Sequence, residues 1–353
     1  MFAGNYAVDK FVLSQALPNF YTGDTMRNIL NFGNFLPVDN EVVAVIGTAV
    51  LPADVAITQS SPQILGPEDI MFLQNQYEHS HAGGAGVQTG LQVYTAADLD
   101  ALRDFTRLRN TFYTVAPRTN MPPELFNIDQ FMQEDLTITL QGDLPKVLIF
   151  HTHTTELFSD SRDISEGIVA VGAYMKQVLE SRHGIPALHI TESFDIVDGR
   201  PSIAGSYERM EPRIRQILDE NPSIQVVLDL HRDGVPEHLH LITEVNGLPT
   251  AQIMFFNGLS MLYQDGVLSD ILSLPNPYLP TNLALSFRMQ LAANEMFPGF
   301  ARRIFLNAFR YSLHMRPKSM LLEIGAQTNT LQEALNAVEP TTDILARVIL
   351  RGG

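Results

Sequence analysis

Cysteine and tryptophan are both absent from this sequence of 353 residues. Without cysteine the chain has no disulfide bond and no thiolate metal site, so histidine, aspartate or glutamate must hold any bound metal. The absence of cysteine is also compatible with an exported protein. No run of about 18 apolar residues occurs, so no segment of the sequence is long and apolar enough to span a bilayer.

Positive charge is scarce as well. The chain has 23 lysine and arginine residues against 39 aspartate and glutamate residues, which gives a formal net charge of −16. Such an acidic chain should not bind nucleic acid or an anionic membrane surface through bulk electrostatics. Its start, MFAGNYAVDKF, lacks the charged-then-apolar order of a signal peptide. This start predicts either a cytosolic protein or a chain that lacks the anchor of a longer one.

The hydrophobic composition of the chain and the order of its apolar runs favour a folded α/β protein. Hydrophobic residues make up 45% of it, which is enough for a sizeable core. Residues 1–135 carry no recognisable chemistry and are expected to form an N-terminal appended region with a docking or regulatory role. From residue 136 onward, apolar runs alternate with segments of helical periodicity. This order predicts a domain over 136–353 with a mostly parallel, twisted sheet and helices on both faces, and this domain also holds the candidate catalytic residues described below.

Three apolar runs lead into polar side chains. Val147–Phe150 runs into His151-Thr152-His153-Thr154-Thr155-Glu156. Ile224–Leu230 runs into His231-Arg232-Asp233, and Ser319–Leu322 runs into Glu323. Ligands of open α/β sheets bind outside the carboxyl ends of the strands. The three runs therefore predict one site at that edge, built from histidine and glutamate.

His153 and His231 are the first candidates for metal ligands. They lie at comparable places after two apolar runs, and neutral imidazole is the commonest protein ligand for metals. Catalytic zinc takes three protein ligands and leaves one position for water. The alternative is that each histidine has only a structural role and caps its strand by hydrogen bonding. The match among three strand ends favours the metal site.

The first motif leaves the third ligand open. His151 and His153 are two residues apart, so in an extended chain both would point to one face, one as ligand and the other toward substrate. Glu156 could supply the carboxylate, and Asp163 or Glu166 could do so instead. The alternative is that Glu156 is a solvent-exposed loop residue that binds no metal.

Glu323 is the candidate for the general base. A carboxylate at the end of a buried strand is costly unless it is paired or used, and near an activated water it could accept a proton. The alternative is an ion pair with a nearby arginine. Arg232 and Asp233 could form such a pair or contact the substrate. They could also orient His231 through the part of its ring that does not bind the metal.

These motifs closely resemble those of a known family. The segments HTHTTE at 151–156, DLHRD at 229–233 and LLEIGAQTNT at 321–330 resemble the stage II sporulation protein P family, which is related to the zinc N-acetylmuramoyl-L-alanine amidases of bacterial cell walls. The similarity covers roughly residues 100–350. The segment 168–180 and Ser206-Tyr207 also fit.

The resemblance implies a zinc-dependent peptidoglycan hydrolase that acts outside the cytoplasm in engulfment during endospore formation. It implies amidase activity that removes stem peptides from glycan, with possible cleavage of peptide crosslinks. It further implies stage II sporulation proteins D and M as partners, and a membrane anchor in full-length members that is absent from this chain. Two other functions stay open, a non-catalytic module that recruits a wall-remodelling partner and a zinc peptidase acting on small peptides.

The resemblance also assigns roles to residues. His153 and His231 match the zinc-binding histidines of the family, and Glu323 matches the catalytic glutamate of the amidase fold. In the related amidases the carboxylate ligand opens the helix after the first strand, which points to Asp163 or Glu166. Glu156 belongs to the first motif of the family itself and is the preferred third ligand.

Overall fold

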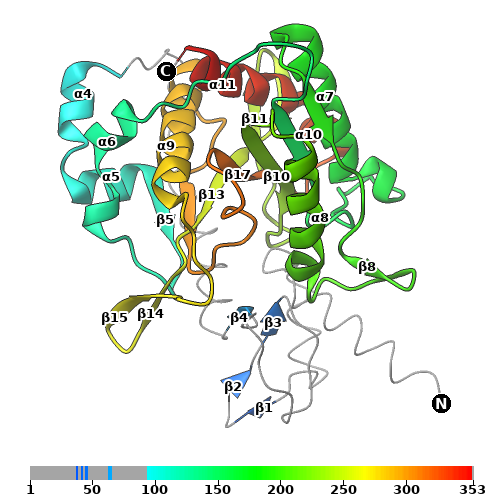
Figure 1. Ribbon diagram of the computed structural model, residues 1–353, viewed down its shortest axis with the longest axis horizontal. Coiled ribbons are helices and arrows are strands. Elements are labelled where there is room, and N and C mark those ends of the chain that lie inside the picture. The colour runs from blue at the N-terminus through cyan, green and yellow to red at the C-terminus, as the bar shows by residue number, and fades with distance from the viewer. Residues whose placement is uncertain (1–36, 39–40, 43, 47–62, 66–93, 352–353) are drawn as a thin grey trace.

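The computed structural model describes residues 37–38, 41–42, 44–46, 63–65 and 94–351 (Figure 1). Their helices, apart from two short 3₁₀ turns, are α4 (Ala96–Ala101), α5 (Phe105–Phe112), α6 (Ile128–Gln133), α7 (Ile168–His183), α8 (Ser206–Glu220), α9 (Leu279–Met296), α10 (Leu331–Asn336) and α11 (Val338–Arg351). None of these helices is both long and apolar enough to cross a membrane.

A seven-stranded sheet forms the centre of the described structure. In spatial order its strands are β5 (Tyr113–Val115), β16 (Ile304–Asn307), β13 (Ile253–Gly258), β17 (Ser319–Ala326), β10 (Val226–Asp233), β6 (Val147–Phe150) and β7 (Ala187–His189). All neighbouring strands are parallel except β13 and β17. The prediction of a mostly parallel sheet is therefore confirmed.

Helices cover both faces of this sheet, as predicted. Along β6, Val147 and Ile149 enter the large core that α7, α9 and α11 also line, whereas Leu148 and Phe150 enter a second cluster against α8. This alternation follows from the period of two residues in a strand. Figure 1 shows the strands at the centre with helices around them. Because the sheet is covered on both sides, its middle strands are apolar along most of their length.

The described residues just before 136 pack with the main sheet and its core. β5 lies at the edge of the main sheet, where it pairs with β16, and Phe112 and Phe131 are buried in the same core as Val147. A three-residue edge strand acquires its place only through tertiary pairing, which the sequence pattern alone does not reveal. A docking or regulatory role for the earlier residues stays a prediction, and most of them lie outside the described residues.

Short antiparallel pairs make up the remaining strands of the described part. They are β1 (Pro37–Val38) with β2 (Glu41–Val42), β3 (Ala44–Ile46) with β4 (Gln63–Leu65), β8 (Ile196–Val197) with β9 (Arg200–Pro201), β11 (Ile242–Val245) with β12 (Leu248–Ala251), and β14 (Met261–Gln264) with β15 (Val267–Asp270). The β11–β12 hairpin turns at Asn246-Gly247, and both residues have the positive φ that its tight turn requires.

Candidate metal centre

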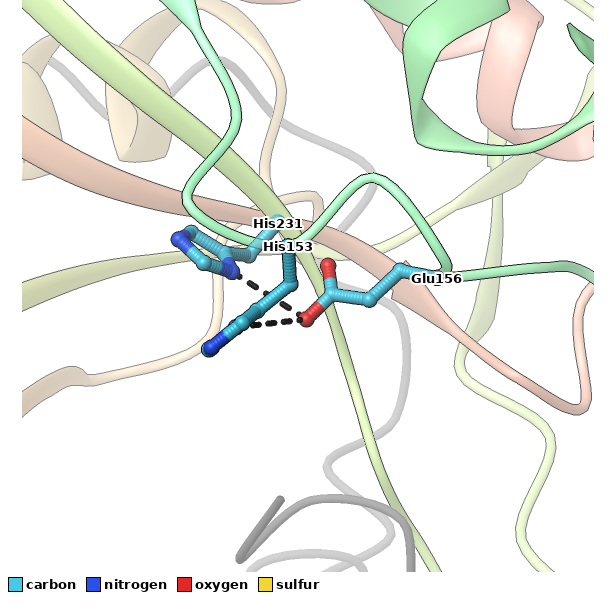
Figure 2. Close-up of side chains that lie close together, drawn as sticks. All are labelled: His153, Glu156 and His231. Atoms are coloured by element: carbon cyan, nitrogen blue, oxygen red, sulfur yellow. Dashed lines mark hydrogen bonds and ion pairs between the residues drawn. The ribbon is translucent and has the colours of Figure 1, made fainter. Parts of the chain in front are cut away.

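The sheet brings two of the three sequence motifs together directly. β6 and β10 are parallel neighbours in which Phe150 lies opposite Asp229. His231 follows two residues later in β10, and His153 lies in the loop that leaves β6. Glu156 is in the same loop. Ligand atoms of His153, Glu156 and His231 lie within 4.8 Å of one another, and all three side chains are buried (Figure 2).

One carboxylate oxygen faces both imidazole rings. Oε1 of Glu156 lies 3.1 Å from Nδ1 of His231 and 3.5 Å from Nδ1 of His153 (Figure 2). The other oxygen, Oε2, accepts a hydrogen bond of 2.8 Å from the backbone N–H of Arg232. The Arg232 side chain is also buried, and its Nε donates to the carbonyl oxygen of Leu157. Arg232 thus fixes the loop and the carboxylate that faces the histidines.

The far nitrogen of each histidine lies close to an oxygen. Nε2 of His231 lies 3.0 Å from Oδ1 of Asp229, and Nε2 of His153 lies 3.0 Å from Oγ of Ser206. The Ser206 hydroxyl donates to the carbonyl oxygen of Ile203, so it accepts from His153. With a metal in place of the protons shared with Glu156, an N–H at each Nε2 would leave the Nδ1 lone pairs free to bind it. Metal-binding histidines are oriented in this way, so these residues fit a zinc ion.

Charge within the group favours a bound cation. Burial alone would lower the pKa of His231, but the charges of Asp229 and Glu156 outweigh it and raise this pKa well above its usual value. Burial alone would raise the pKa of Glu156, but His231 and the hydrogen bonds from both histidines outweigh it and lower this pKa. The buried carboxylates thus hold a positive charge between them, which a divalent ion would supply in place of a proton.

Glu323 lies beside this group on the next strand. Its backbone is the direct partner of His231 across β17 and β10, with Met254 of β13 on its other side. Its side chain is only 2% exposed. Burial raises its pKa well above the usual range, and the charge of Asp233 raises it further. His231 and Glu323 both lie in the carboxyl-terminal halves of their strands, and His153 and Glu156 lie in the loop after β6, so the site is at the predicted edge of the sheet.

Asp163 and Glu166, the alternative third ligands, lie apart from the two histidines. Asp163 accepts a hydrogen bond from the backbone N–H of Ser165 at the start of a 3₁₀ turn, and Glu166 forms an exposed ion pair with Arg162. The structure therefore groups Glu156 with the histidines. Asp233 is ion-paired with Arg302, whose Nη2 lies 2.8 Å from its Oδ2.

His151 does not share a face with His153, and this expectation was wrong. Its Nδ1 lies 3.0 Å from the carbonyl oxygen of Leu230, and its Nε2 lies 2.8 Å from Nε2 of His189. The imidazoles of His151 and His189 lie against Gly172 of α7. Because β6 ends at Phe150, the strand alternation no longer applies to the residues after it.

Three residues beside the centre were not singled out as functional from the sequence pattern. Asp229 orients His231 and also accepts hydrogen bonds from the backbone and hydroxyl of Thr152. Its signal was a carboxylate within an otherwise apolar run. Ser206 and Tyr207 begin α8, and the Tyr207 ring makes a T-shaped contact with His153 at 5.6 Å. Their places depend on the path of α8, which no local pattern indicated.

Comparison with solved structures finds bacterial amidases. One is the crystal structure of N-acetylmuramoyl-L-alanine amidase from Clostridium difficile 630, at 13% identity over 58% of this chain and 95% of that chain, with a TM-score of 0.32. Another is the CwlD amidase from Clostridioides difficile in complex with the GerS lipoprotein, at 14% identity over 57% of this chain and 94% of that chain, with a TM-score of 0.36.

Sequence comparison finds a curated relative. Stage II sporulation protein P of Bacillus subtilis (strain 168) is 21% identical over 232 residues, which are 61% of this chain and 54% of that protein. The chain thus spans about half the length of this relative. The family model described as Stage II sporulation protein P matches residues 106–350, well over half of the chain. The chain therefore belongs to the stage II sporulation protein P family.

Proposed function

We propose that this chain is a zinc-dependent peptidoglycan hydrolase, an N-acetylmuramoyl-L-alanine amidase. It would cut the amide between the lactyl group of muramic acid and L-alanine. The observation that supports this function is the grouping of His153, Glu156 and His231 beside Glu323 in a chain of this family. A complete set of two histidines and two glutamates favours an enzyme over a purely non-catalytic module.

His153, Glu156 and His231 would hold the ion. When bound, zinc would lower the pKa of water, polarise the amide carbonyl and favour the ionised form of Glu323. Glu323 then accepts a proton from the water that adds to the carbonyl carbon. It passes this proton to the leaving nitrogen as the carbon–nitrogen bond breaks. The products are the lactyl carboxylate and a stem peptide with a free amine.

Membership of the family supports further parts of this proposal. The same site would also cleave peptide crosslinks, and the protein would act in engulfment during endospore formation, together with stage II sporulation proteins D and M. It would work outside the cytoplasm, at the membrane. The net charge of −16 gives little general attraction to an anionic wall polymer. Substrate capture should therefore depend on local contacts at the site.

Mass spectrometry of digested peptidoglycan tests this function. The zinc-loaded protein should release stem peptides with a free L-alanine amine, whereas Glu323→Gln should bind zinc and release almost none. Glu124→Gln, an exposed exchange of the same kind, serves as the matched control. If the zinc-loaded protein releases no stem peptide, or if Glu323→Gln digests at the rate of the control, the proposed function is wrong.

A further inference from the structure

Tyr207 lies next to a candidate zinc ligand. It is the second residue of α8, directly after Ser206, whose hydroxyl holds Nε2 of His153. The centroids of the Tyr207 and His153 rings are 5.6 Å apart, with an angle of 88° between the ring planes. The hydrogen bond of Ser206 and this ring contact together place Tyr207 at the metal centre.

The opposite side of the ring is also supported. Tyr207 makes a second T-shaped contact with Tyr311, at 5.6 Å, and Tyr311 packs on Phe256 of β13 at 4.8 Å. Tyr311 has a positive φ of 52°, an uncommon backbone conformation for a bulky residue. The loop that carries it lies so close to Gly258 that a Cβ there would be 1.9 Å from the carbonyl oxygen of Phe309. The Tyr207 ring is therefore held on two sides before any substrate binds.

The hydroxyl groups of these two tyrosines differ in their surroundings. The Tyr311 hydroxyl accepts a hydrogen bond of 2.7 Å from Asn307. Among the residues that the structure describes, none makes a hydrogen bond with the hydroxyl of Tyr207, which is only partly buried. This phenol keeps its proton at neutral pH and remains a hydrogen-bond donor.

We propose that Tyr207 is a further catalytic residue, whose hydroxyl donates a hydrogen bond to the carbonyl oxygen of the scissile amide. This inference rests on the proposed function. As water adds to the carbonyl carbon, negative charge develops on that oxygen, and a donor held in place stabilises it without rearranging. The tyrosine keeps its own proton throughout. The water proton still passes through Glu323 to the leaving nitrogen.

Comparison of Tyr207→Phe with Tyr311→Phe tests the inference. Both exchanges remove one hydroxyl and keep the aromatic contacts, but only Tyr207 adjoins the metal centre. Tyr207→Phe should lower kcat by about 100-fold or more with little change in KM, since loss of one such donor costs about 100- to 1,000-fold. Tyr311→Phe should retain most of the turnover. Zinc content and melting temperature should change little in either variant.

Binding of a tetrahedral phosphonate analogue of the scissile amide gives a readout that does not depend on turnover. Its affinity should fall in Tyr207→Phe by a factor similar to the loss in kcat/KM. Equal turnover and equal phosphonate affinity in the two variants would overturn the inference while the proposed function stands. A loss of zinc from Tyr207→Phe would overturn it too, because the residue would then act through the metal site. If the zinc-loaded wild type does not cut, the proposed function fails and this inference with it.

Discussion

The Oδ1 atom of Asp229 lies 3.0 Å from Nε2 of His231. Both residues belong to β10, and their side chains are buried. Burial alone would raise the pKa of Asp229, but His231 outweighs this effect and lowers it, so the carboxylate stays ionised. A carboxylate behind a histidine fixes the direction of the ring and makes its other nitrogen a stronger donor to metal.

Asp229→Asn should therefore weaken zinc binding by about 10- to 100-fold, the usual cost of losing such a partner. Competition with a chromogenic chelator would measure the change. Asp163→Asn is the matched control, because Asp163 is exposed and makes its hydrogen bonds to Ser165. Equal zinc affinity in these two variants would show that Asp229 does not orient His231.

Gly172 lets α7 approach two histidines closely. A Cβ at this position would be 2.6 Å from Nε2 of both His151 and His189. In an exposed helix the change from glycine to alanine stabilises by about 1 kcal/mol. Here Gly172→Ala should destabilise by about 1–3 kcal/mol, because the imidazoles or the helix must shift. Urea unfolding, with exposed Ala173→Ser as control, would show the sign. A gain in stability would mean that the histidines move aside at no cost.

The same two histidines predict a dependence of stability on pH. Burial lowers the pKa of His151 to about 4 and that of His189 to about 3. In the unfolded chain both would titrate near 6.5. Between these values the unfolded state binds more protons, so stability is complete above about pH 6.5 and falls as the pH falls toward 4.

His189→Asn removes one of the two groups that bind a proton in the unfolded state but not in the folded state. The free energy of unfolding should then fall less steeply with acid than in the wild type, by up to about 1.4 kcal/mol per pH unit. Urea unfolding at a series of pH values between 4 and 7 would measure both slopes. The contributions of titrating groups that the two proteins share cancel when one slope is subtracted from the other. Parallel curves for the two proteins would contradict the half-buried, neutral state of His189.

Much of the site was predictable because its chemistry lies in short motifs. Apolar runs predicted β6, β10 and β17, and the polar residues after or near their ends predicted that His153, His231 and Glu323 would converge. The pairing of β10 with both β6 and β17 brings them together. Glu156 was preferred on the family motif, and the structure groups it with the two histidines.

The remaining features depend on tertiary contacts. The direction of His151 depends on the exact end of β6, and one residue of strand more or less would reverse it. The contact between Ser206 and His153 requires α8 to begin beside the loop after β6. The place of Tyr113 at the edge of the main sheet depends on its pairing with Ile304, which lies far away in sequence.

Zinc stoichiometry of purified variants tests the ligand assignment most directly. The wild type and His151→Ala should each carry about one equivalent, whereas His153→Ala and His231→Ala should carry almost none, since a catalytic site depends on all three of its protein ligands. His151→Ala should show reduced turnover, because its ring supports the chain just before His153. Inductively coupled plasma mass spectrometry on protein purified without chelator would give the values. Loss of zinc from His151→Ala with retention in His153→Ala would contradict the assignment.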